Sequence, residues 1–165
     1  MTILSTLQEI SRNPDTLCIT PKRSMPVLSW IETASRSDPE CIAPGEGTDL
    51  LTMYSERVDL AGHTGPKPVR GTGLARLNGF AAFCFERPNR TIIAGGHSLF
   101  FREFFRTFLC SAATSSVEKR ARKVKMANGG VVGFTLVRAP RKDAPSEFEY
   151  KIRPASLVQL HREAW

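Results

Sequence analysis

Residues 91–109 read TIIAGGHSLFFREFFRTFL, and this stretch decides the fold class that the sequence predicts. Its first four residues form a short apolar run without alternation, which is typical of a strand covered on both faces in a parallel sheet. Two glycines and His97 follow, and then phenylalanines recur at three- and four-residue steps. That spacing predicts a helix over 99–109 with one apolar stripe in the core. The stripe consists of Phe101, Phe104, Phe105 and Phe108.

The flanking segments extend this pattern into an alternation of helices and strands. Upstream, apolar residues recur at helical spacing over 74–85, and Pro88 ends the predicted helix. Downstream, residues 131–137 form a second apolar run, and residues 148–152 alternate as an edge strand does. Helix, strand, helix, strand is the order of βαβ units, so the sequence predicts an α/β fold.

The length and composition favour one soluble globular domain over residues 1–165. A chain of 165 residues with 41% hydrophobic and 24% charged residues can bury a core and is not typical of disorder. It contains no run of about 18 apolar residues and no basic, apolar secretory signal. We therefore expect a cytoplasmic protein without membrane association. The four cysteines lack zinc-ligand spacing, so we expect reduced thiols, no metal site and no cofactor.

The net charge of +7 is concentrated in one segment. Residues 117–125 read VEKRARKVK, with five cations and one anion, inside a basic insert that we place at 111–127. Such a run is either a solvated helix face or a surface for an acidic partner, nucleic acid or lipid headgroups. No aromatic residue is interleaved with the cations to stack on bases, so nucleic acid is an unlikely partner on this pattern.

The position of His97 predicts an anion site. In open α/β sheets, ligands bind beyond the carboxyl ends of the strands, and His97 directly follows the predicted strand. The glycines before it permit close approach to the backbone, and the N–H groups of the next helix suit an anion such as phosphate. We predict a phosphate site formed by His97 and Ser98, with Arg102 one turn later as a weaker contributor.

Three stretches together resemble the C-terminal half of the histidine phosphatase superfamily, which is also called phosphoglycerate mutase-like. They are RLNGF at 76–80, ERPNRTIIAGGHSLFFR at 86–102 and ANGGVV at 127–132. The resemblance covers residues 4–137 and is most specific over 76–102. It implies a mixed sheet flanked by helices. It also implies phosphoryl transfer to one histidine, while a second histidine stabilises the phosphoryl oxygens and a carboxylic acid protonates the leaving group.

On this resemblance His97 matches the second histidine, whose imidazolium would hydrogen-bond the phosphoryl oxygens as their charge develops. The segment LQEI at 7–10 resembles the family's acid-bearing segment, so Glu9 is the candidate proton donor. The alternative for Glu9 is an ordinary surface carboxylate. The catalytic prediction is thus the pair His97 and Glu9.

The sequence departs from the family at the nucleophile. It contains no Arg-His-Gly motif, and neither His63 nor His161 follows an apolar strand. We expect an N-terminally truncated or degenerate domain that binds a phosphorylated small molecule but is inactive on its own. One alternative is an active phosphatase whose Arg-His-Gly segment precedes Met1. The other is a non-catalytic interaction protein that binds an acidic partner through 117–125.

The missing family strand also bears on solubility. Its absence would leave the predicted strand at 91–94 with an unpaired edge and an uncovered apolar face. We therefore expect self-association through this edge, or a replacement strand supplied by residues 4–10 or 17–19.

Overall fold

The structure, a computed structural model, describes residues 2–7, 22–23, 56–65, 73–110 and 115–161. The chain divides into two compact units. The first comprises Met1–Gln8 and Arg12–Gly71, and the second comprises Glu9–Ser11 and Thr72–Trp165.

The first unit joins the start of the chain to the segment around Asp59. The N–H of Ile3 donates to the carbonyl of Asp59 at 2.8 Å, and Thr2 forms a parallel bridge with Asp59. The short 3-10 helix η1, Ser5–Leu7, follows directly. The described part of the stretch 4–10 is therefore not a replacement strand, and residues 17–19 lie outside the described ranges.

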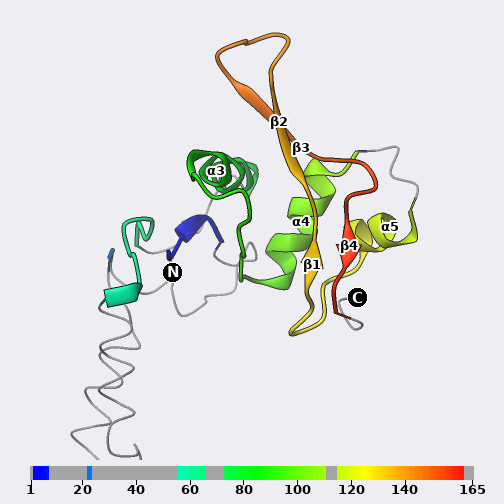
Figure 1. Ribbon diagram of the computed structural model, residues 1–165, viewed down its shortest axis with the longest axis horizontal. Helices are drawn as coiled ribbons and strands as arrows, with labels where there is room; N and C mark the ends of the chain where they lie inside the picture. Colours follow the sequence, from blue (N-terminus) through cyan, green and yellow to red (C-terminus); the bar gives the residue numbers. More distant parts are fainter. Residues whose placement is uncertain (1, 8–21, 24–55, 66–72, 111–114, 162–165) are drawn as a thin grey trace, which may run out of the picture. The chain divides into compact units, whose positions relative to one another are not determined.

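The core of the second unit is built on helix α4, Ser98–Phe108, between α3, Gly73–Glu86, and α5, Ser116–Lys123 (Figure 1). The predicted phenylalanine stripe is confirmed as core packing, except that Phe100 and not Phe101 belongs to its buried side. Phe100 is fully buried and Phe101 only half-buried, because residues 100, 104 and 108 form the i, i+4 row facing the core. Phe80 of α3 packs edge-on against Phe100 and Phe104, with centroids 5.8 and 5.6 Å apart.

The strands form two antiparallel pairs. Strand β1, Val132–Gly133, pairs with β4, Val158–Gln159, and β2, Leu136–Pro140, pairs with β3, Phe148–Ile152. The single strand predicted over 131–137 is therefore interrupted. Phe134 lies at the interruption, where its ring contacts Phe104 and Phe105 at centroid distances of 5.8 and 5.6 Å. The chain changes pairing partner at this point.

The predicted parallel strand at 91–94 is wrong. Residues 91–97 adopt no regular structure, and Ile93 is 98% exposed. A strand needs a neighbour for its backbone groups, and no described segment pairs with these residues. The open strand edge on which the expected self-association rested is thus not formed. Both sheets of the described residues are antiparallel, so the βαβ arrangement is corrected to a mixed α/β unit with small antiparallel sheets.

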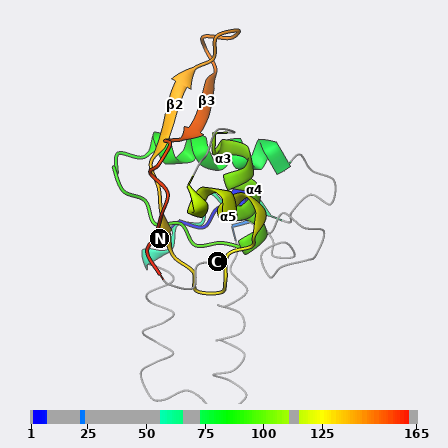
Figure 2. The same cartoon turned by 90° about the vertical axis from the view of Figure 1, so that its right-hand side faces the viewer.

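The β2–β3 hairpin is held at its base by the bridge between Leu109 and Ile152, contacts Phe85 of α3 further along, and projects its far end away from the helices of the second unit (Figures 1 and 2). Beside α3, the guanidinium of Arg138 lies over the rings of Phe85 and Phe148, at 4.9 and 4.8 Å. At the far end, Arg141 forms an ion pair with Asp143. Alternation along β3 is confirmed at Tyr150 and Ile152, which turn inward beside exposed Glu149 and Lys151, whereas Phe148 at the start of the strand is 44% exposed.

Candidate functional site

His97 occupies the N-cap position of α4. Its backbone is extended, with φ −83° and ψ 143°, and its carbonyl accepts the first helical hydrogen bond from the N–H of Phe101 at 3.1 Å. The imidazole is half-buried and does not cap the helix. Ser98 is the first helical residue, and the first turn contains no acidic residue. The positive end of the helix dipole is therefore not neutralised by a carboxylate in that turn.

The backbone that leads into His97 is open. Gly95 and Gly96 are exposed, and a Cβ atom built on Gly95 would meet nothing within 4 Å. The space beside the backbone at Gly95 is therefore open to a ligand that approaches His97. This arrangement agrees with the role that the sequence predicted for the two glycines, although their predicted strand is not formed.

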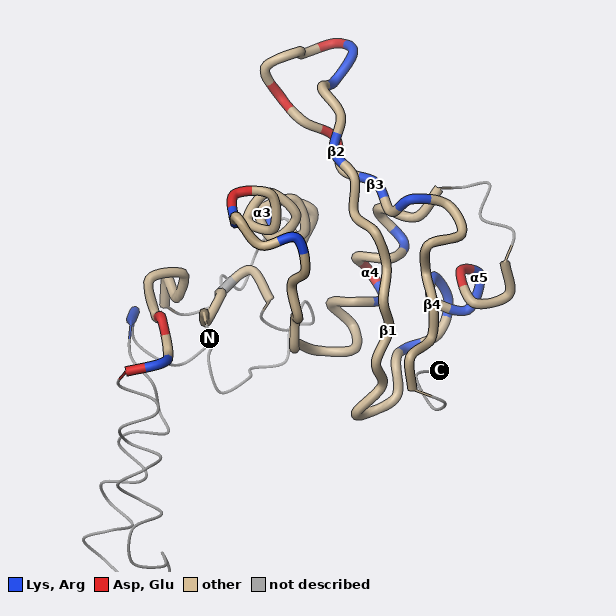
Figure 3. Tube along the Cα trace, in the orientation of Figure 1, with Lys and Arg blue, Asp and Glu red and all other residues tan. Residues whose placement is uncertain are grey.

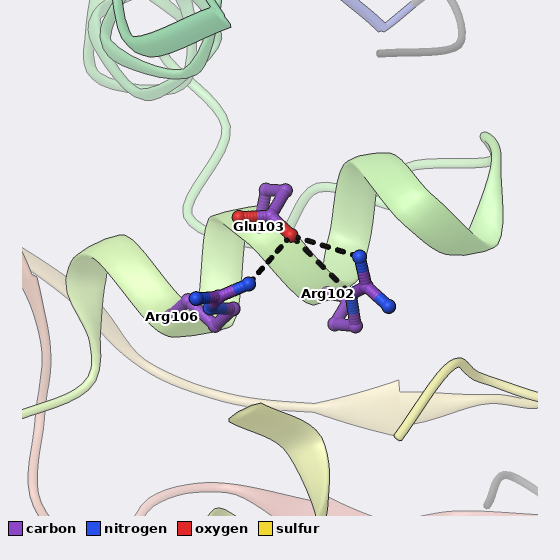
Figure 4. A network of polar contacts seen from close by, with 3 residues as sticks. All are labelled: Arg102, Glu103 and Arg106. Atoms are coloured by element: carbon purple, nitrogen blue, oxygen red, sulfur yellow. Dashed lines mark hydrogen bonds and ion pairs between the residues drawn. The ribbon is translucent and has the colours of Figure 1, made fainter. Parts of the chain in front are cut away.

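Arg102 lies one turn after Ser98 and is held by a neighbouring carboxylate. Its Nη2 and Nε atoms lie 3.1 and 3.3 Å from Oε1 of Glu103, and Nη1 of Arg106 lies 3.2 Å from the same oxygen (Figure 4). The side chains of Arg102 and Glu103 are each 28% exposed. To bind phosphate, Arg102 would first have to exchange this contact.

The other acid and histidines named by the sequence analysis are Glu9, His63 and His161. Glu9 lies outside the described residues, so its predicted role as proton donor stays a prediction. His63 belongs to the first unit and is fully buried, which its glycine- and proline-rich surroundings in the sequence did not indicate. His161 is exposed, just after β4.

Helix α5 begins at a capping box that the sequence analysis did not predict. Its one acid, Glu118, is only 3% exposed and forms a capping box with Ser115. The Glu118 carboxylate also accepts a hydrogen bond from the N–H of Ala155 at 3.0 Å. The spacing of Ser115 and Glu118 is the sequence signature of this cap and marks where the helix begins.

Other chemistry is limited in the described parts of the chain. Burial raises the pKa of the Cys84 thiol to about 11, so this side chain is protonated and a poor nucleophile at neutral pH. Cys110 is exposed. Among the described residues, no group of three or more His, Cys, Asp and Glu side chains is placed to hold a metal ion. None of the described helices is long and apolar enough to span a bilayer.

Comparisons of the chain with protein-family models, with curated proteins and with solved structures find no match. The resemblance to histidine phosphatases therefore rests on the sequence stretches quoted above.

Proposed function

We propose that this chain is a histidine phosphatase-like domain that binds phosphorylated small molecules in the cytoplasm through His97 and Ser98. One observation carries the proposal. His97 lies at the N-cap of an eleven-residue helix, after an open glycine pair and ahead of a first turn without acidic residues. A phosphate there would meet an imidazole, a hydroxyl and backbone N–H groups.

The same residues explain binding better than turnover. A protonated His97 would donate a hydrogen bond to a phosphoryl oxygen, and the Ser98 hydroxyl would donate another. Glu9, as proton donor, belongs to this proposal. A covalent phosphohistidine step needs a positioned nucleophile, and the sequence contains no Arg-His-Gly motif to supply one. We therefore propose little phosphatase activity for the chain as given.

Nuclear magnetic resonance of the histidine rings tests the binding step. Titration with inorganic phosphate and with vanadate should shift the His97 ring signals, while those of exposed His161 serve as the internal control. The backbone amide signal of Ser98 should also shift on titration, and His97→Ala should abolish that shift. Ser98→Ala should weaken binding. An unchanged His97 ring at millimolar ligand, or an equal response at His161, would remove the proposal.

An assay with an activated aryl phosphate tests the catalytic step. We expect no turnover above that of a His97→Ala variant. Activity that disappears in His63→Ala or His161→Ala would show that the nucleophile was wrongly excluded.

A further inference from the structure

Helix α5 turns its cations to solvent and its other face to the protein. Glu118 and Ala121 are buried, at 3% and 0% exposure, where α5 packs against α4. The exposed side chains include four cations, which we name the α5 basic face. The α5 basic face consists of Lys119, Arg120, Lys123 and, just after the helix, Lys125. Figure 3 shows the basic positions along α5.

The burial of Glu118 leaves this face without an opposing charge of its own. The carboxylate accepts hydrogen bonds from the hydroxyl and the N–H of Ser115 at 2.9 and 3.4 Å, and from the N–H of Ala155 at 3.0 Å. Its oxygens are thus used inside the fold. Within the described ranges, the salt bridges involve other side chains, and none joins a cation of the α5 basic face to a carboxylate.

The surrounding unit is itself strongly cationic. Residues 73–161 contain 15 Lys and Arg against 6 Asp and Glu, although the whole chain carries only +7. The first 72 residues carry 7 Lys and Arg against 9 Asp and Glu. Positive charge is therefore concentrated in the part of the chain that carries α5, which is the electrostatic signature of a surface for a polyanion.

We infer that the α5 basic face binds the phosphate backbone of double-stranded nucleic acid, without sequence preference. A helical rise of about 1.5 Å per residue places Lys119 and Lys123 about 6 Å apart along the axis. Duplex DNA carries one charge per roughly 1.7 Å of its axis and releases condensed counterions when cations bind. An acidic peptide offers a lower charge density, and exposed ion pairs with it contribute little.

Helix α5 contains no aromatic residue, which disfavours stacking on bases but not contact with phosphates. Stacking on aromatic rings serves unpaired bases, whereas contact with duplex phosphates needs only cations and hydrogen-bond donors. The lack of aromatic residues on α5 therefore disfavours the binding of single strands. It does not disfavour contact with a duplex backbone.

Salt titration of binding to a fluorescent DNA duplex by the full chain tests this inference. Four phosphate contacts predict that affinity falls about 150-fold between about 50 and 200 mM salt. The double variant Lys119→Gln with Lys123→Gln should fall only about 12-fold, because two contacts are lost. The matched control, Lys142→Gln with Lys151→Gln, removes the same charge from the exposed hairpin and should keep the steeper dependence.

Each alternative outcome is distinct. Equal salt dependence in the two double variants, or no binding at low salt, would overturn the inference. A strong preference between two unrelated duplex sequences would contradict backbone recognition. Poly-glutamate that binds as tightly as the duplex, with the same sensitivity to Lys119 and Lys123, would identify an acidic protein as the partner instead.

Discussion

Replacing Glu118 with alanine tests how α5 is fixed to the second unit. The side chain connects two segments that are 37 residues apart in sequence, the start of α5 and the turn at Ala155. Its exposure is only 3%, so the contacts are made inside the fold rather than in bulk water. Alanine would remove the side-chain half of the capping box and the acceptor for the N–H of Ala155.

The expected loss follows from these contacts. The bond from the N–H of residue 118 to the Ser115 hydroxyl remains, so the variant loses only the carboxylate half of the capping box, which costs less than the roughly 1 kcal/mol of a whole N-cap. A hydrogen bond to a charged group contributes about 1.5–3 kcal/mol, but water entering the vacated space would recover part of it. We expect a net destabilisation of about 2 kcal/mol, which for a chain of this length lowers Tm by about 4–8 °C. Glu118→Gln should cost less than half as much, because glutamine at this position still serves a capping box.

Urea denaturation followed by circular dichroism measures the difference in the free energy of unfolding. Glu147→Ala is the matched control, because Glu147 is exposed and its ion pair with Arg141 lies on the hairpin. That variant should change stability by less than about 0.5 kcal/mol. If Glu118→Ala cost no more than Glu147→Ala, Glu118 would not anchor α5, and the argument that its charge is withdrawn into the fold would fail.

Three further predictions concern the core and the thiols. Phe104→Ala should destabilise the chain by about 4 kcal/mol, because Phe104 is fully buried, whereas half-buried Phe101→Ala should cost less than half of that in the same urea titration. Equal losses would contradict the packing of α4. An aromatic disulfide reagent at neutral pH should modify Cys110 and spare Cys84, as peptide mass mapping would reveal. Because the folded state raises the pKa of Cys84 from 9.0 to about 11, its contribution to stability should be complete below pH 9 and lost as the pH rises towards 11, a dependence that Cys84→Ala should remove.

Local patterns in the sequence predicted three elements of the second unit, α3, α4 and β3. The phenylalanine spacing placed α4 within one residue, since a helix that buries one face needs apolar residues at steps of three and four. The alternation at 148–152 located β3 with its correct ends for the same kind of reason. The burial of Glu118 was not predicted, although Ser115 three residues before it is the signature of a capping box.

Pairing between distant segments was not predictable in this way. The run at 91–94 has the composition of a buried strand, but composition does not supply a neighbouring strand, and Ile93 is exposed instead. The interruption at Phe134 has a similar cause. The apolar run at 131–137 does not show where pairing with β4 ends and pairing with β3 begins. That point is set by Phe134, whose ring packs against Phe104 and Phe105 of α4. The candidate site was predictable only in its local part, the order of glycine, histidine and helix start.

Helix α4 links the core to the candidate site. Its aromatic row fixes the helix axis, and its far end is held where Leu109 forms a bridge with Ile152 of β3. His97 therefore extends from a helix that is anchored along its length, while the glycines before it leave the approach open. The charged pair Arg102 and Glu103 lies on the helix surface beyond the first turn, so the negative charge of Glu103 is already matched before an anion arrives. An anion at His97 would then meet the helix N-terminus and not an unpaired carboxylate of the same helix, because Glu103 is the acid that α4 contains.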